Sequence, residues 1–147
     1  MMDIDAIKAN FNKDIGNTEL CAKVLDYCDI FNRTVKRAKQ AGFTKAAWAP
    51  FAELVDVATF QRVGHQCEVM NWSEYTDFVS QFAAALEWEG NFRRVQERGN
   101  VVYLELTERC SIGDHVDVSN TMTVYKFNDH GKLCHLDVYL QQKPAQV

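Results

Sequence analysis

A histidine and an aspartate stand two residues apart near the end of the chain, in the apolar segment His135-Leu136-Asp137. Alternation along a strand puts these two side chains on one face and the flanking leucines and valine on the other. If Asp137 faces an apolar interior, desolvation raises its pKa toward the range that suits proton transfer near neutral pH. If the leucine row faces the core instead, His135, Asp137 and Tyr139 face outward. Alternation alone permits either arrangement.

Glu108 is a second candidate for acid–base chemistry. Val102, Leu104, Leu106, Glu108 and Cys110 fall on one face of a predicted strand, and this face is more apolar than the other. Glu108 therefore extends a row that is expected to face the core, where a carboxylate needs a partner. The alternative is that the strand has left the core by this point and Glu108 is simply hydrated.

Two further polar side chains interrupt apolar rows. Arg62 shares its face with Phe60 and is expected to point inward, where it would bind an anionic oxygen or pair with Glu108. Asn120 lies in a row of valines and a methionine, either as a polar pocket group or as a satisfied strand residue. His65 falls in a loop at the expected rim, where a surface role is the ordinary interpretation.

Aromatic residues at helical spacing could enclose a flat, apolar ligand, or could simply form core. The residues concerned are Trp72, Tyr75, Phe82 and Trp88.

The elements that must position these residues follow from the hydrophobic period. Apolar spacings of three and four predict helices, and alternation after Gly90 predicts strands. The predicted helices are a short one over 4–11, a long one from Thr18 to Gly42, a short one from Thr44 interrupted by Pro50, and one from Asn71 to before Gly90. The predicted strands are 55–63, 92–98, 101–110, 116–127 and 133–141. This order indicates an α+β domain with its helices on one face of a largely antiparallel sheet.

Composition narrows the classes of function. The 147 residues carry a net charge of -4 and are 47% hydrophobic, which is typical of one globular domain and not of a nucleic-acid-binding protein. No run is long and apolar enough to span a membrane, and the acidic start is unlike a secretory signal. Five scattered cysteines predict reduced thiols in the cytoplasm.

Motifs for metals, cofactors and nucleophiles are missing from the sequence. No Cys-x-x-Cys pair or other close ligand pair is present, so no metal is predicted. Neither Gly-x-Gly-x-x-Gly nor Gly-x-Ser-x-Gly occurs, so neither a nucleotide cofactor nor a serine nucleophile is predicted.

Two segments in this order of elements carry a resemblance to a known superfamily. Val55-Asp56-Val57-Ala58-Thr59-Phe60 looks like the strand after its second helix, and 125–133, Tyr-Lys-Phe-Asn-Asp-His-Gly-Lys-Leu, looks like its terminal hairpin. Over residues 17–141 the chain resembles nuclear transport factor 2-like proteins, within them SnoaL-like polyketide cyclases and ketosteroid isomerases. The resemblance implies a cone-shaped roll, in which a curved mixed sheet wraps around a long helix and two others and encloses an apolar pocket. Residues 1–16 would be an extension and 17–147 a single domain.

Some catalytic residues of the SnoaL-like cyclases and ketosteroid isomerases have a counterpart in this sequence, and others do not. His135-Leu136-Asp137 matches the His-x-Asp segment that supplies the acid–base aspartate of SnoaL-like cyclases. The general-base aspartate of ketosteroid isomerases falls at Arg62, and their oxyanion-hole acid falls near Thr123. A second pocket histidine of the cyclases also falls near Thr123. These departures argue against steroid-isomerase chemistry, which needs two carboxyl groups with separated pKa values.

The sequence therefore predicts a cofactor-independent isomerase, cyclase or dehydratase acting on a small, apolar, carbonyl-containing molecule. Asp137 would move the proton, His135 would orient it, Glu108 would be a second acid–base group, and Arg62 would stabilise negative oxygen. The other residues expected at the substrate are Phe60, Trp72, Tyr75, Asn120, Thr123 and Tyr139. The alternative is a non-catalytic binding or assembly module with the same fold. The resemblance also implies a homodimer through the outer sheet face.

Overall fold

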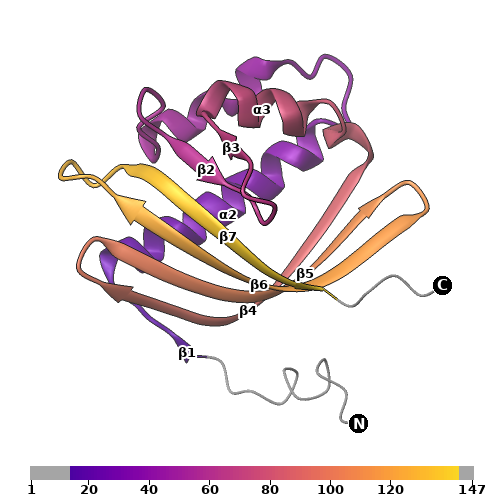
Figure 1. Ribbon diagram of the computed structural model, residues 1–147. Coiled ribbons are helices and arrows are strands. Elements are labelled where there is room, and N and C mark those ends of the chain that lie inside the picture. Colours follow the sequence, from indigo (N-terminus) through magenta and orange to yellow (C-terminus); the bar gives the residue numbers. More distant parts are fainter. Residues whose placement is uncertain (1–13, 143–147) are drawn as a thin grey trace, which may run out of the picture.

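The described part of this computed structural model, residues 14–142, places its helices over one face of a curved sheet (Figure 1). The helix expected over 4–11 lies outside the described residues. The helical elements are α2 (Glu19–Arg37), the 3-10 helix η1 (Lys45–Glu53), α3 (Trp72–Ser80) and the 3-10 helix η2 (Ala83–Ala85). The strands are β1 (Asp14–Ile15), β2 (Gln61–Val63), β3 (Val69–Met70), β4 (Leu86–Arg98), β5 (Val101–Ile112), β6 (His115–Phe127) and β7 (Leu133–Gln142).

The seven strands form one sheet in the order β1-β4-β5-β6-β7-β2-β3. Strands β4 to β7 are an antiparallel meander, while β1 pairs parallel with β4 and β2 pairs parallel with β7. Gly99 and Gly131 have φ of 61° and 71° in two of the connecting turns, a backbone region that glycine enters without strain. The α+β class and the curved, mixed sheet are as the sequence predicts.

Helix α2 buries the predicted apolar stripe against the concave face of the sheet (Figure 1). Thr18 occupies the N-cap position, but its side chain makes no capping bond to the helix. Instead Glu97 of β4 accepts hydrogen bonds from the Thr18 hydroxyl (2.6 Å) and the Leu20 amide (3.0 Å). A carboxylate at this end also favours the helix dipole. The sheet thus supplies the acceptor that fixes the start of α2.

The strand predicted over 55–63 is wrong except for its last three residues. Val55 makes only an isolated bridge to Leu133, and the chain then turns at Asp56. The Asp56 carboxylate accepts a hydrogen bond from the Ala58 amide (3.2 Å), an Asx-type turn that competes with strand pairing. Only β2 remains to pair with β7 and carry Arg62.

The third helix is also shorter than predicted, and β4 begins six residues earlier than expected. Helix α3 ends at Ser80, and Leu86 already pairs with Ile112. Trp88 therefore lies on a strand, and strand alternation fixes the direction in which its side chain points.

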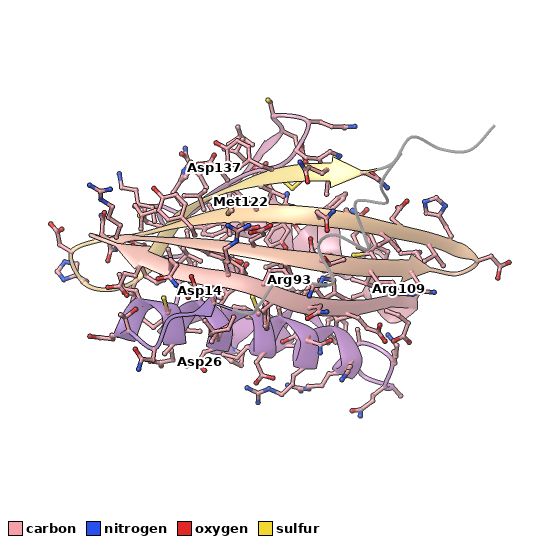
Figure 2. The ribbon with its side chains drawn as sticks, turned by 90° about the horizontal axis from the view of Figure 1, so that it is seen from below. Asp14, Asp26, Arg93, Arg109, Met122 and Asp137 are labelled. Carbon is pink, nitrogen blue, oxygen red and sulfur yellow. The ribbon has the colours of Figure 1, made fainter. Side chains whose placement is uncertain are left out.

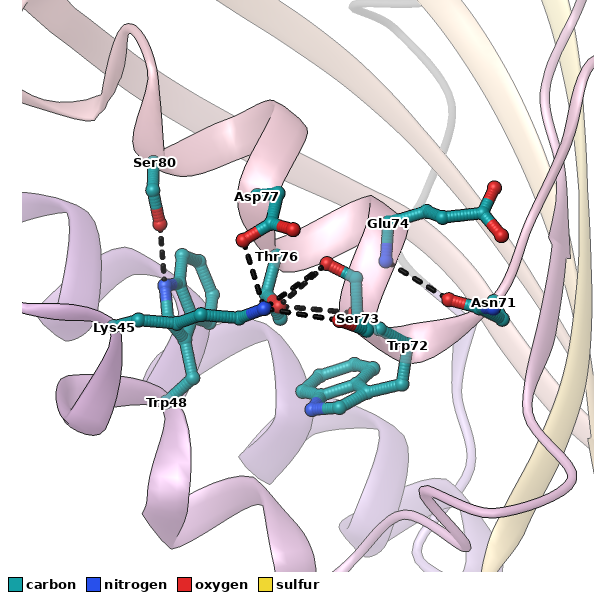
Figure 3. Close-up of polar contacts among 9 residues, drawn as sticks. All are labelled: Lys45, Trp48, Asn71, Trp72, Ser73, Glu74, Thr76, Asp77 and Ser80. Atoms are coloured by element: carbon teal, nitrogen blue, oxygen red, sulfur yellow. Dashed lines mark hydrogen bonds and ion pairs between the residues drawn. The ribbon is translucent and has the colours of Figure 1, made fainter.

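Helix α3 is fastened to η1 by side-chain contacts (Figure 3). The Asn71 side chain caps α3 by accepting from the Glu74 amide (2.8 Å). Lys45 pairs with Asp77 (2.7 Å), and the Trp48 indole donates to the Ser80 hydroxyl (2.9 Å). Aromatic rings of η1, α3 and α2 pack against one another and complete the core on this side. No helix within residues 14–142 is long and apolar enough to cross a membrane.

Candidate active site

A cavity of about 440 Å³ lies between the concave face of the sheet and the helices. Its helical side is mostly apolar, with Phe31 from α2 and Phe78, Val79 and Phe82 from α3 and the segment after it. The sheet side contributes a row of polar residues on β5 and β6. The cavity therefore has one apolar wall and one wall able to form hydrogen bonds, which is the usual construction of a small-molecule site.

Glu108 lies in the sheet wall of this cavity, on the face that alternation along β5 predicts. One carboxylate oxygen accepts a hydrogen bond from the Trp88 indole (2.7 Å), and the other accepts one from the Thr121 hydroxyl (2.6 Å). These two donors offset the cost of removing a carboxylate from water. Because a carboxylate has about four lone-pair positions, each oxygen keeps one for a ligand.

Tyr27 of helix α2 lines the same cavity, and its hydroxyl is buried. The side chain is buried, and among the described residues its hydroxyl has no hydrogen-bond partner. Burial raises the pKa of Tyr27 well above its ordinary value, and neighbouring Tyr75 adds to the rise without meeting hydrogen-bond geometry. Tyr27 therefore remains protonated and can donate. An unsatisfied buried hydroxyl costs free energy unless something else accepts its hydrogen bond.

Arg62 also reaches the cavity, from strand β2. Its guanidinium carbon lies 4.9 Å from the centre of the Tyr75 ring, and its nitrogen is 3.9 Å from a Glu68 oxygen. The ion pair with Glu108 considered from the sequence is not formed within the described residues. Burial raises the pKa of Tyr75, and the positive charge of Arg62 opposes part of that rise. His65, in the adjacent hairpin, lines the cavity as well.

A second carboxylate, Asp117, lies in the cavity wall toward the β5–β6 hairpin. It accepts a hydrogen bond from the Gln142 side chain (2.9 Å) and lies 3.0 Å from the His115 ring. Its side chain is 45% exposed, so it sits at a wet part of the wall rather than in the apolar interior.

Sequence reasoning missed the polar row to which Asp117 belongs. Every second residue of β6 after Asp117 lies on the same face and lines the cavity: Ser119, Thr121, Thr123 and Tyr125. The valines and the methionine of β6 occupy the opposite, outer face. The alternation is present in the sequence, but hydrophobicity alone does not show that the polar face of this strand is the one that lines the cavity. Thr123 does line the cavity, as expected.

His135 and Asp137 lie on the outer face of the sheet, away from the cavity. Asp137 pairs across β6 with Val124, whereas Leu136 pairs with the cavity residue Tyr125. Figure 2 looks onto this outer face and shows Asp137 on it beside Met122. His135 and Asp137 contact each other at 3.1 Å, both about one third exposed. The expectation that they face the pocket is corrected, because the leucine row of β7 takes the cavity side.

Four other residues expected at the substrate do not line the cavity. Phe60 and Trp72 pack against each other in the core, with ring centres 5.1 Å apart. Asn120 faces outward and accepts a hydrogen bond from Thr107 (2.9 Å). Tyr139 is 60% exposed on the outer face. Of the residues considered from the sequence, the structure brings together Glu108, Arg62, His65, Tyr75, Thr123, Phe82 and Trp88.

The two thiols in the cavity wall are poor nucleophiles. Burial raises the pKa of Cys28 to about 12. Burial, followed by the charges of Glu108 and Asp117, raises the pKa of Cys110 to about 11. Since the thiolate is the reactive form, neither side chain suits covalent catalysis at neutral pH. Across residues 14–142, no three His, Cys, Asp or Glu side chains are grouped so as to hold a metal ion.

No protein-family model and no curated protein sequence matches the chain. Solved structures do match it. An LEH-like epoxide hydrolase from M. tuberculosis superposes with a TM-score of 0.60 at 13% identity, covering 82% of this chain and 84% of that one. An NTF2-like protein of unknown function from Pseudomonas aeruginosa gives 0.58 at 13% identity, covering 81% and 98%.

The chain has the nuclear transport factor 2-like fold. A putative SnoaL-like polyketide cyclase from Jannaschia sp. CCS1 has a TM-score of 0.58 at 12% identity, covering 86% of this chain and 90% of that one. At such identities the likeness shows the fold and not the reaction. The reaction has to be argued from the cavity itself.

Proposed function

We propose that the chain is a cofactor-independent acid–base enzyme, an isomerase, cyclase or dehydratase, whose substrate is a small, mostly apolar carbonyl compound. One observation carries this proposal: the Glu108 carboxylate, held by two hydrogen bonds, lies in the wall of a cavity that is also lined by Tyr27, whose buried hydroxyl has no partner among the described residues. The first can accept a proton and the second can donate a hydrogen bond to an oxygen. The names of the structural neighbours, which include an epoxide hydrolase, cyclases and isomerases, agree with this class but do not select a reaction.

Glu108 is the general base of the proposed reaction. Its carboxylate takes a proton from the carbon next to the carbonyl, and the electrons of that C–H bond form the double bond of an enolate. Trp88 and Thr121 hold the carboxylate in place through one hydrogen bond to each oxygen, which leaves further acceptor positions for a ligand. Return of the proton to another carbon isomerises the substrate, while loss of a leaving group from the enolate would give dehydration.

Tyr27 and Arg62 stabilise the negative charge that develops on the carbonyl oxygen. Tyr27 is a neutral donor whose raised pKa keeps it protonated, and burial removes competing water. Arg62 contributes a positive charge, partly exposed and held over the Tyr75 ring. Donors that are already in position before charge develops provide the largest single contribution in many enzymes of this type.

Deuterium exchange tests the proposal without knowledge of the natural substrate. The bicyclic ketone 2-tetralone is incubated in D₂O with the protein, and loss of its α-proton signals is followed by NMR. Wild-type protein is expected to exchange these protons faster than buffer. Glu108→Gln should lose about 10²–10⁴-fold in rate, which is the usual contribution of a general base.

Asp129→Asn is a charge-matched control in an exposed turn and should exchange like wild type. Equal rates in wild type and Glu108→Gln would refute the proposed role of Glu108. Saturable binding of 2-tetralone without any enzyme-dependent exchange would instead support the alternative, a small-molecule-binding module with this fold.

A further inference from the structure

A second concave space lies on the other side of Trp88. It is a cleft of about 860 Å³ between helix α2 and the first half of strand β4. Its walls are part polar and part apolar, and the polar part includes Asp29, Asn32 and Lys36 from the helix. Among the described residues, only Trp88 and Cys28 line both the cleft and the cavity that holds Glu108. These two side chains therefore form the partition between the two spaces.

Two contacts hold the Trp88 indole in this partition. Its ring nitrogen donates to Glu108 at 2.7 Å. The six-membered ring lies over Gly90, where a Cβ atom would come within 2.5 Å of the indole Cη2 and 2.7 Å of Cζ2. Any other residue at position 90 would displace the indole. The absence of a side chain at Gly90 and the carboxylate of Glu108 together keep Trp88 flat against the strand.

We propose that Trp88 is the specificity-determining residue of the site, because it ends the cavity and limits the length of the ligand. Small-molecule sites usually measure about 300–1,000 Å³. The cavity alone, at about 440 Å³, suits a compact ketone of two or three rings. With the indole removed, the cavity opens into the cleft. A longer ligand then enters, with its apolar part beside Glu108 and a polar end among the cleft residues.

This inference rests on the proposed function, since it assumes that the cavity holds a carbonyl compound. The test compares the dissociation constants of two probes, measured by ligand-observed NMR. One probe is 2-tetralone, and the other is 2-tetralone carrying a six-carbon hydroxyalkyl ether on its aromatic ring. The informative quantity is the ratio of the two dissociation constants within one protein, because a general loss of stability affects both probes alike.

Wild type should bind the longer probe at least tenfold more weakly than 2-tetralone. In Trp88→Ala the two probes should bind about equally. Phe82→Ala is the matched control, because it enlarges the same cavity from a side that does not border the cleft, and its ratio should stay that of wild type. Gly90→Ala keeps the tryptophan but displaces the indole, so it should give an intermediate ratio even if Trp88→Ala folds poorly.

An unchanged ratio in Trp88→Ala and Gly90→Ala would overturn the role of Trp88 and leave the proposed function standing. The same would follow if Phe82→Ala reproduced the change. Failure of wild type and all variants to bind either probe would contradict both proposals.

Discussion

Glu108 and Tyr27 both line the cavity, the first half-buried and the second buried, but only Glu108 has hydrogen-bond partners among the described residues. Glu108 accepts two hydrogen bonds, whereas the hydroxyl of Tyr27 has no partner within residues 14–142. A buried hydroxyl without a partner costs about 1–3 kcal/mol relative to a satisfied one. Sites that are built to bind a transition state commonly retain such a cost in the free protein.

Replacement of Tyr27 by phenylalanine should therefore separate stability from activity. Tyr27→Phe is expected to raise the free energy of unfolding by about 1 kcal/mol, because the unsatisfied hydroxyl is removed and the ring contacts remain. The rate of 2-tetralone exchange should fall by about 10²-fold, as for loss of an oxyanion donor. Urea unfolding and NMR exchange provide the two measurements. A variant less stable than wild type would show that the hydroxyl is satisfied in solution.

The sequence identifies Glu108 but not Tyr27, and the reason is physical. Alternation along β5 is unambiguous, since one face is clearly more apolar. Tyr27 belongs to the apolar stripe of α2, so the sequence identifies it only as a core residue. Whether its hydroxyl has a hydrogen-bond partner is known only from the structure. The sequence places Asp137 on the wrong face, because either row of β7 side chains could face the core when the strand is considered alone. Only the pairing of β7 with β6 decides between the two rows.

The sequence predicts the types of the helices and strands better than the residues at which they begin and end. The long helix, the meander and its turns follow from period and glycine positions. Helix α3 stops at Ser80 and β4 starts at Leu86, although the aromatic spacing continues through both. The pairing of the first residues of β4 with β5 outweighs local helical preference, and this long-range pairing is not encoded in any short segment.

Helix α3 supplies part of the apolar wall of the cavity, so its capping should affect the site. Asn71→Ala removes the acceptor for the Glu74 amide and is expected to lower the free energy of unfolding by about 1 kcal/mol (Figure 3). Asn71→Asp keeps the acceptor and should remain close to wild type. Urea unfolding followed by circular dichroism measures both. Equal losses in the two variants would show that the cap contributes through something other than this hydrogen bond.

At the scale of the whole molecule, the sheet has an unusual distribution of polarity. The cavity face of β6 is polar, while its outer face carries valines and a methionine. Tyr103 and Tyr139 add exposed aromatic surface on neighbouring strands. Exposed apolar patches of this kind commonly mark protein–protein interfaces. We propose that the outer face pairs with a second copy of the chain.

Light scattering at micromolar concentration tests this pairing. Wild type is expected to have the mass of a dimer, and Tyr139→Glu should shift it toward the monomer by placing a charge in the exposed apolar part of this face. Val57→Glu is the control, because Val57 is similarly exposed but lies in a turn away from this face. A monomeric wild type would contradict the proposal, as would equal disruption by both variants.

The most direct test of the account is a comparison of two carboxylates on opposite faces of the sheet. The 2-tetralone exchange rate is measured for Glu108→Gln and for Asp137→Asn under identical conditions. Because Glu108 lines the cavity and Asp137 lies outside it, the first variant should lose about 10²–10⁴-fold and the second should match wild type. Loss of exchange in Asp137→Asn, with exchange retained in Glu108→Gln, would contradict the account.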